Sequence, residues 1–240
     1  MADYPVVTST IFEDTFTGTP NAYLEVYDPS WKMLNTRGSN NYIRITDVGR
    51  IRGHYHRQRA YREEVLAGEY VVSADVYTAS EYKYSSAGIL FGVNPTTTEY
   101  YLFSIDNVDP IDRTIGMVQL VIGSGDSTIR ESINITNISA PTNSTHRLAV
   151  HVKGTNQAEF FIDGVHVYTL ADSTPITIDA NSKAGVNVHS YGASSNTRSY
   201  HLDNFKIEAV ADGGGGDPGP VTPTIDSLTH VNPSPMFYLI

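Results

Sequence analysis

The chain has 240 residues, a formal charge of −10, 18% charged residues and no cysteine. The negative charge would repel the phosphates of a nucleic acid, and the missing thiols exclude disulfides and thiolate metal sites. No segment reaches the ~18 apolar residues of a membrane-spanning helix. The first residues also lack the basic and apolar stretches of a signal peptide.

Apolar and polar residues alternate along much of the chain, which indicates strands with one buried face. In residues 68–78, Tyr70, Val72, Ala74 and Val76 share one face. Leu148, Val150 and Val152 do the same further along the chain. Other expected strands cover residues 87–93, 98–105, 115–123, 157–162, 165–170 and 199–210.

Asp163-Gly164 separates two of these strands and predicts a two-residue hairpin, because a type I′ turn needs positive φ at both central positions. No window shows a convincing helical period. About a dozen short strands bounded by turn residues are typical of a sandwich or jelly roll. The sequence therefore predicts an all-β, antiparallel two-sheet β-sandwich over residues 1–210.

The composition changes after Val210. Residues 211–224 contain four consecutive glycines and three prolines, which predicts a linker that joins neither a sheet nor a helix. Residues 225–240 form an apolar tail that ends in Met236, Phe237, Tyr238, Leu239 and Ile240. This tail is either a loose chain end or an anchor that binds a partner.

Four segments resemble the concanavalin A-like lectin/glucanase superfamily, in particular its laminin-G-like jelly-roll modules. They are Phe12–Gly18, Phe160–Val165, Ala184–Val186 and Leu202–Ile207, in the order found in those modules. The resemblance implies a jelly-roll sandwich that often carries a structural calcium. It leaves function open, because members include lectins, glycosidases, adhesion modules and viral surface proteins.

Glycosidases of that superfamily are similar to one another in a strand with Glu-x-Asp-x-x-Glu, which supplies the carboxylates for hydrolysis. This chain has no such run, and the adjacent Glu63 and Glu64 would point to opposite faces of a strand. Acidic residues from distant segments could still converge. From the missing run we expect a protein that is not an enzyme.

Two groups of acidic residues are candidates for calcium, which prefers oxygen ligands. Asp106, Asp109 and Asp112 fall in one predicted loop, although their spacing does not match an EF-hand. The alternative is a solvated acidic turn. The second group is Asp14 with Asp203–Asn204, where short polar side chains that form turn hydrogen bonds are the favoured interpretation. No other cofactor is expected.

Basic residues concentrate in one short stretch of this acidic chain. Five arginines lie within 13 residues: Arg50, Arg52, Arg57, Arg59 and Arg62. We take the last three as candidates to dock an acidic partner, a second copy or an anionic sugar. The alternative is that they pair within the chain, for example with Glu63 and Glu64.

Tyr82, Tyr84 and Tyr191 are candidate platforms for stacking against a sugar ring. The alternative is that each caps the core from a strand. Taken together, these features predict a non-catalytic virion-surface protein, a bacteriophage head decoration or tail component that attaches through its C-terminal tail. Its expected partners are other virion subunits or further copies of itself, and a host glycan. The alternatives are a carbohydrate-binding module of a secreted protein and a glycoside hydrolase with an unrecognised site.

Overall fold

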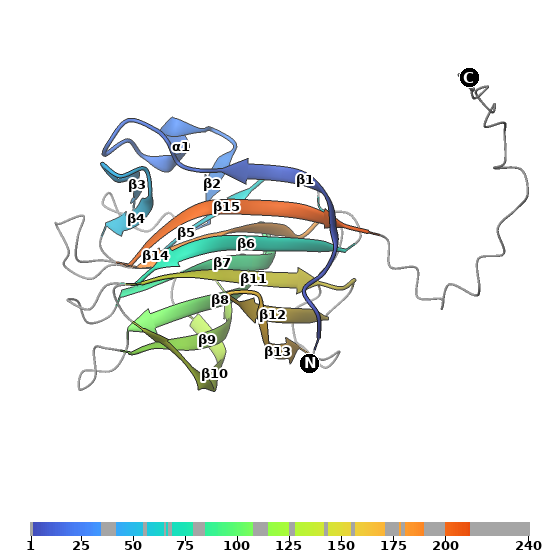
Figure 1. Cartoon of the computed structure of the whole chain (residues 1–240). Helices are drawn as coiled ribbons and strands as arrows, with labels where there is room; N and C mark the ends of the chain where they lie inside the picture. The colour runs from blue at the N-terminus through green and yellow to red at the C-terminus, as the bar shows by residue number, and fades with distance from the viewer. Residues whose placement is uncertain are drawn as a thin grey trace, which may run out of the picture.

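The computed structural model describes most of the chain up to residue 211 (Figure 1). The described residues are 2–34, 42–54, 57–64, 66, 69–78, 85–107, 115–124, 128–141, 144–154, 157–170, 178, 181–189 and 200–211. Within them the chain forms two antiparallel sheets that pack face to face, with one short helix, α1 (Leu24–Tyr27). The predicted all-β sandwich is confirmed.

The first sheet has eight strands and faces the viewer in Figure 1. Its central strand is β15 (His201–Val210), the last strand of the sandwich. The beginning of β15 pairs with β4 (Ile51–His54), and the rest of the same edge of β15 pairs with β1 (Val7–Asp14). In spatial order the strands are β13 (Val165–Leu170), β12 (Ala158–Ile162), β11 (Thr145–Val152), β6 (Tyr70–Tyr77), β15 (His201–Val210), β4 (Ile51–His54) and β3 (Tyr42–Ile45), with β1 (Val7–Asp14) beside β15.

The second sheet has seven strands and lies behind the first in Figure 1. Consecutive strands β7 to β10 form a meander, and β14 then joins the meander to β5. The spatial order is β10 (Thr128–Pro141), β9 (Ile115–Ser124), β8 (Glu99–Asn107), β7 (Ser85–Asn94), β14 (Lys183–His189), β5 (Arg57–Arg62) and β2 (Trp31–Met33).

Aromatic side chains from the two sheets meet in the core. The Phe91 and Tyr101 rings stack with centroids 5.1 Å apart on the seven-stranded sheet. Phe160 of the facing β12 meets Phe91 at 5.6 Å and Phe103 at 5.1 Å, edge to face. Such pairs add to the free energy gained by removing the rings from water. The alternation predicted for β6 and β11 is confirmed, since the named residues of both strands belong to this core.

The predicted hairpin between β12 and β13 is also confirmed. Its two turn residues, Asp163 and Gly164, have φ values of 51° and 78°, as a type I′ turn requires. The turn places the Asp163 carboxylate beside β11, where Oδ1 accepts a hydrogen bond from the Arg147 backbone N–H and Oδ2 contacts His146 Nδ1 at 2.9 Å.

Strand β15 ends at Val210, and the positions from 212 onward lie outside the described residues. The division into a sandwich, a linker and a tail therefore stays a prediction, as does any role of residues 236–240. Among the residues described, no helix is long and apolar enough to cross a membrane.

Candidate functional site

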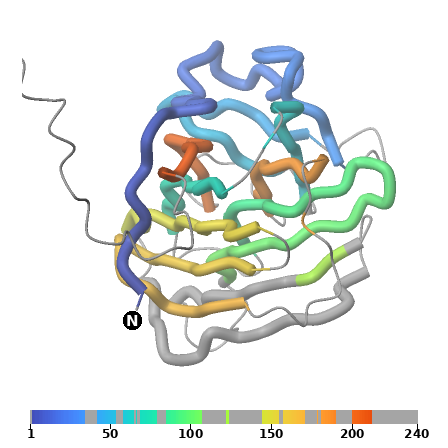
Figure 2. The backbone as a smooth tube through the Cα atoms, turned by 90° about the vertical axis from the view of Figure 1, so that its right-hand side faces the viewer, coloured from blue at the N-terminus to red at the C-terminus, as the bar shows by residue number. Residues whose placement is uncertain are grey.

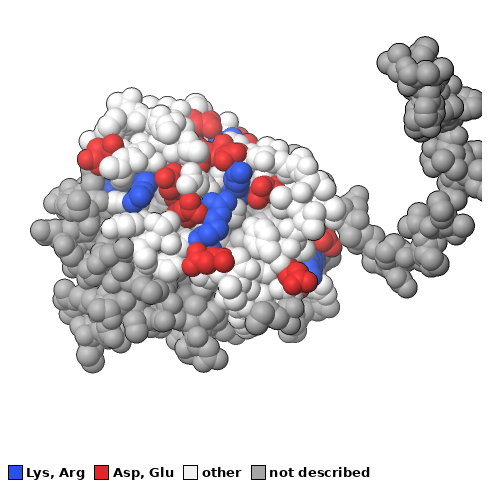
Figure 3. All heavy atoms as spheres, viewed as in Figure 1, with Lys and Arg blue, Asp and Glu red and all other residues white. Residues whose placement is uncertain are grey.

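On the outer face of the eight-stranded sheet, the polar groups of the central strands β6, β11 and β15 bond to one another. Arg147 on β11 bonds to Asp75 on β6 at 2.9 Å and to the Ser73 hydroxyl at 2.7 Å, while Asn204 donates to the other Asp75 oxygen at 2.7 Å. Figure 3 shows basic side chains interleaved with acidic ones across this face. Because these charges already have partners, this central part of the face offers few unused hydrogen-bonding groups to a ligand.

The N-terminal segment also covers part of that face. In Figure 2 it runs down the outside of the eight-stranded sheet. The ring of Tyr4 packs edge to face against Phe161 of β12, with centroids 5.2 Å apart. Phe161 belongs to a buried apolar patch with Val71 and Ala149, against which Val210 also packs.

The outer face of the seven-stranded sheet is built differently. The pairing places Asn187 of β14 opposite Gly88 of β7, and Gly88 opposite Ser104 of β8. One step along the same face, Ser86 lies opposite Asp106. Asn187, Ser86, Ser104 and Asp106 thus form a compact group of polar side chains across three neighbouring strands, which we call the polar row.

Two hydrogen bonds order the polar row. Asn187 Nδ2 donates to Ser86 Oγ at 3.3 Å, and Ser104 Oγ donates to Asp106 Oδ1 at 3.0 Å. All four side chains are at least nine-tenths buried. Asn187 Oδ1 is buried as well, and no described residue gives it a hydrogen bond. A buried amide oxygen without a donor costs roughly 1–3 kcal/mol, so this acceptor is a place where a ligand hydroxyl would gain free energy.

Glycine keeps the middle of the polar row flat. A Cβ built on Gly88 would lie 2.2 Å from the Phe103 carbonyl oxygen and 2.6 Å from the Ser104 Cα. Any side chain at position 88 would therefore collide with the neighbouring strand. With glycine there, no side chain stands between Asn187 and Ser104.

An apolar patch adjoins the polar row on the same face. It consists of Leu34, Leu90, Val93, Tyr100 and Leu102, with Tyr61 half-buried against it. The Arg59 guanidinium lies over the Tyr100 ring, 4.6 Å from its centroid, as expected for a cation–π contact. Hydroxyl, amide and carboxylate groups beside an aromatic and aliphatic patch are the chemistry that binds a sugar, which has hydroxyl groups and apolar C–H faces.

The predicted docking arginines are not on an open surface, which corrects that prediction for two of them. Arg59 and Arg62 are 1% and 4% exposed. Arg62 binds Asp28 at 2.5 Å and Glu64 at 2.6 Å, so the alternative of pairing within the chain holds for it. Its guanidinium also lies 3.8 Å from the centroid of the Phe12 ring. Arg57 lies in β5, with its side chain outside the described part.

The two predicted calcium groups have different outcomes. Asp14 Oδ1 accepts the Phe16 backbone N–H at 2.7 Å, and Asp203 Oδ1 accepts the N–H of Asn204 at 2.8 Å. These are the turn hydrogen bonds favoured from the sequence. Asp106 belongs to the polar row. Asp109 and Asp112 lie outside the described residues, so a calcium site that uses them stays a prediction.

Tyr82, Tyr84 and Tyr191, the predicted aromatic platforms, also lie outside the described residues. Asn187, Ser86 and Ser104 were not predicted as site residues from the sequence. Their signal was faint, because single polar residues at outward positions of otherwise apolar strands form no motif. Only the strand pairing brings them together.

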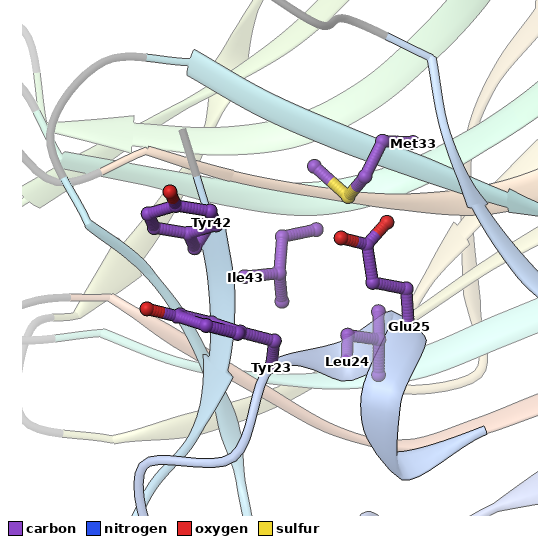
Figure 4. A pocket seen from close by; sticks show the side chains of 6 residues that line it. All are labelled: Tyr23, Leu24, Glu25, Met33, Tyr42 and Ile43. Atoms are coloured by element: carbon purple, nitrogen blue, oxygen red, sulfur yellow. The ribbon is translucent and has the colours of Figure 1, made fainter. Parts of the chain in front are cut away.

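A shallow hollow lies elsewhere, beside α1 and β3 (Figure 4). It encloses about 160 Å³, including space open to solvent, and is lined by Tyr23, Leu24, Glu25, Met33, Tyr42 and Ile43. Ligand pockets usually enclose roughly 300 Å³ or more. This hollow therefore admits only a small group.

No protein-family model and no curated protein matches the sequence. Solved structures do match its fold. Carbohydrate-binding module CBM66 from Bacillus subtilis is 13% identical, with a TM-score of 0.53, covering 75% of this chain and 96% of that one. A Bacillus subtilis protein of unknown function with a galectin-like fold is 10% identical, with a TM-score of 0.55 and coverage of 87% and 99%. A β-1,3-glucanase from Mycobacterium marinum is 9% identical, with a TM-score of 0.55 and coverage of 83% and 99%.

These similarities confirm the resemblance to concanavalin A-like jelly rolls at the level of the fold. They also correct the expectation that the chain is not an enzyme, because a glucanase shares the architecture. That expectation was based on one missing local motif. Catalytic carboxylates can come from strands that are far apart in the sequence, so a missing motif does not exclude catalysis.

Proposed function

We propose that this protein binds carbohydrate on the outer face of its seven-stranded sheet. The observation that carries the proposal is Asn187 Oδ1, a buried acceptor without a donor among the described residues, within a row of hydroxyl and carboxylate groups. The similarity to a carbohydrate-binding module supports the same function. It does so through the fold alone.

The polar row supplies several kinds of hydrogen bond to a sugar. Asn187 Oδ1 would accept from one sugar hydroxyl, and the Asp106 carboxylate would accept from another more strongly because it is charged. The Ser86 and Ser104 hydroxyls can donate or accept. Because these groups are shielded from water, each hydrogen bond to a ligand would be stronger than on an exposed surface.

The apolar patch would set the orientation of the ligand. Tyr100 and Leu102 are 1% and 5% exposed and the Arg59 guanidinium covers the Tyr100 ring, so the C–H face of a pyranose ring would meet the aliphatic edge of the patch, with its hydroxyl edge toward the polar row. A neutral polysaccharide with equatorial hydroxyls fits this division into an apolar and a polar half.

Titration calorimetry with a panel of soluble neutral polysaccharides tests the proposal. Asn187→Leu removes the amide while nearly keeping the side-chain volume, and should weaken binding of whichever polysaccharide binds about tenfold. Thr169→Val on β13, an exposed polar-to-apolar change on the other sheet, is the matched control and should bind like the wild type. Binding by no polysaccharide, or equal affinity of Asn187→Leu, would overturn the proposal.

Glycoside hydrolysis is the second candidate, favoured by the glucanase of the same fold and by the placement of Asp106 in the polar row. It would need a second carboxylate about 5–10 Å from Asp106. Release of reducing ends in the same incubations tests it. Asp106→Asn should then abolish the release while leaving binding measurable.

Display on a virion surface through residues 225–240 stays a separate prediction. It rests on the sequence of the tail. Deleting those residues should abolish attachment to a particle without changing the thermal unfolding of the sandwich. Unchanged attachment would refute it.

A further inference from the structure

Two arginines face each other on the β3–β4 hairpin. The antiparallel pairing sets Arg44 opposite Arg52, which places both side chains on the same side of the hairpin. Arg52 is only 5% exposed, and its Nε and Nη1 have no hydrogen-bond partner in the described part of the chain. The buried Nε of Arg44 has none there either.

A guanidinium without a partner is expensive to bury, because it loses its hydration and gains no hydrogen bonds in return. The Arg44 side chain is held by Tyr23. Its Nη2 donates to the Tyr23 hydroxyl at 3.3 Å, and its Cζ lies 5.0 Å from the centroid of the Tyr23 ring. Among the described residues, Arg52 has no such hydrogen bond or ring contact, although the Asp47 charge attracts it. The hairpin thus holds two positive groups close together with N–H donors still unused.

The surroundings of the pair are positive as well. Arg50 lies 4.8 Å from the centroid of the Tyr77 ring, which is stacked on His201. Burial, with Arg50 and Arg52 adding to it, lowers the pKa of His201 to about 4, whereas Asp47 acts in the opposite direction. Asp203 also interacts with Arg50, so three arginines against two aspartates leave an excess of positive charge here, in a chain of net charge −10.

We propose that Arg44 and Arg52 form a site for an oxyanion, the carboxylate or sulfate group of an acidic saccharide. Guanidinium groups bind both kinds of oxyanion through paired, charge-assisted hydrogen bonds. Such a group would supply the partners that Nε and Nη1 of Arg52 lack. The small exposed fraction of Arg52 admits a single small group rather than a broad surface.

The saccharide part rests on the proposed function. The hairpin packs directly on β14, the strand that carries Asn187, since a Cβ at Gly53 would lie only 2.7 Å from the Val188 carbonyl oxygen. Arg44 and Arg52 alternate with the core residues Ile43 and Ile51 and so point away from β14, which places the arginine pair on the opposite face of the sandwich from Asn187. The proposed occupant is the carboxylate or sulfate group of an acidic saccharide.

Affinity electrophoresis of the full chain compares dextran with dextran sulfate, and a neutral glucan with a polyuronate. The chain should be retarded more strongly by one of the acidic polymers, and the effect should weaken with added salt. Arg52→Gln should reduce that affinity about tenfold. Lys32→Gln, which removes a cation that is 43% exposed on β2, should leave it unchanged. Arg52→Lys keeps the positive charge but lacks the paired N–H groups of the guanidinium. It is the variant to measure if Arg52→Gln does not fold.

Thermal unfolding in sodium sulfate, against sodium chloride at equal ionic strength, probes the oxyanion site alone. Wild type should gain more in Tm from sulfate than Arg52→Gln does. Equal Tm gains in the wild type and in Arg52→Gln would overturn the oxyanion site. So would an equal loss of polymer binding in Arg52→Gln and Lys32→Gln. Retardation by polyglutamate but by no acidic polysaccharide would overturn the saccharide assignment in favour of an acidic protein.

The two proposals fail separately. If neutral polysaccharides bind and Arg52→Gln changes nothing, the oxyanion site is wrong and the carbohydrate face stands. If no neutral polysaccharide binds but the sulfate effect depends on Arg52, the carbohydrate face is wrong and the oxyanion site stands.

Discussion

The indole Nε1 of Trp31 donates a hydrogen bond to Asp14 Oδ2 at 3.0 Å and so ties one sheet to the other. Trp31 lies in β2 of the seven-stranded sheet, and Asp14 ends β1 of the eight-stranded sheet. The other Asp14 oxygen accepts from the Phe16 backbone N–H and from the Tyr27 hydroxyl. One carboxylate thus satisfies three donors at the edge of the sandwich.

Asp14→Ala should lower the free energy of unfolding by about 3 kcal/mol or more, because it leaves three donors without their acceptor in a mostly buried place. Urea denaturation at neutral pH measures the loss. Asp3→Ala, at an exposed position of the N-terminal segment, should change stability by less than about 0.5 kcal/mol. A similar effect of the two substitutions would show that Asp14 does not join the sheets energetically.

Gly164→Ala should destabilise the protein by about 1 kcal/mol through the backbone alone, since φ is +78° and a Cβ there would meet nothing within 4 Å. Gly164→Asn should cost less, because asparagine tolerates this conformation better. Both are measured by equilibrium denaturation. An alanine variant as stable as the wild type would contradict a type I′ turn at Asp163-Gly164.

Much of the fold could be predicted because its signals are local. Alternation in β6 and β11 and the Asp163-Gly164 turn are each contained in fewer than a dozen residues. The strand order could not be predicted, because it depends on pairings such as Leu202 of β15 with Ile51 of β4. Those contacts join positions that are far apart in the chain.

The candidate site was hidden for the same reason. Asn187 meets Gly88 and Ser104 only after three strands have paired in one register. For two of the arginines, the local sequence signal was strong but the prediction was wrong. Their local density predicted an exposed cationic surface, but Asp28, 34 positions before Arg62, pairs with it and allows its burial.

His201 should make the protein less stable in acid. Its pKa is lowered to about 4 in the folded chain by burial and by Arg50 and Arg52, whereas an unfolded histidine titrates near pH 6.5. The unfolded state therefore binds the extra proton between these values, and stability falls as the pH drops from about 6.5 to 4. The loss due to His201 is about 3 kcal/mol.

Urea denaturation at pH 7, 5.5 and 4.5 measures that loss. His201→Phe keeps a ring stacked on Tyr77 and should flatten the decrease over this range. An equally steep decrease in the variant would show that His201 does not remain neutral in the folded state.

Arg52→Met should raise the free energy of unfolding by about 1 kcal/mol or more in the absence of anions, because it replaces a buried guanidinium, whose Nε and Nη1 have no hydrogen-bond partner among the described residues, with an apolar chain of similar length. Denaturation in a low-salt buffer without sulfate or phosphate is the measurement. A loss of stability instead would mean that the folded chain already compensates the Arg52 charge.

The location of bound carbohydrate tests the central claim most directly. In ¹H–¹⁵N spectra of the full chain titrated with a binding oligosaccharide, the side-chain amide of Asn187 and the backbone amides of Ser86 and Ser104 should shift most. The amides of Ser73 and Arg147, on the outer face of the other sheet, should stay in place. Shifts concentrated at Ser73 and Arg147, with the Asn187 side chain unmoved, would contradict the proposed binding face.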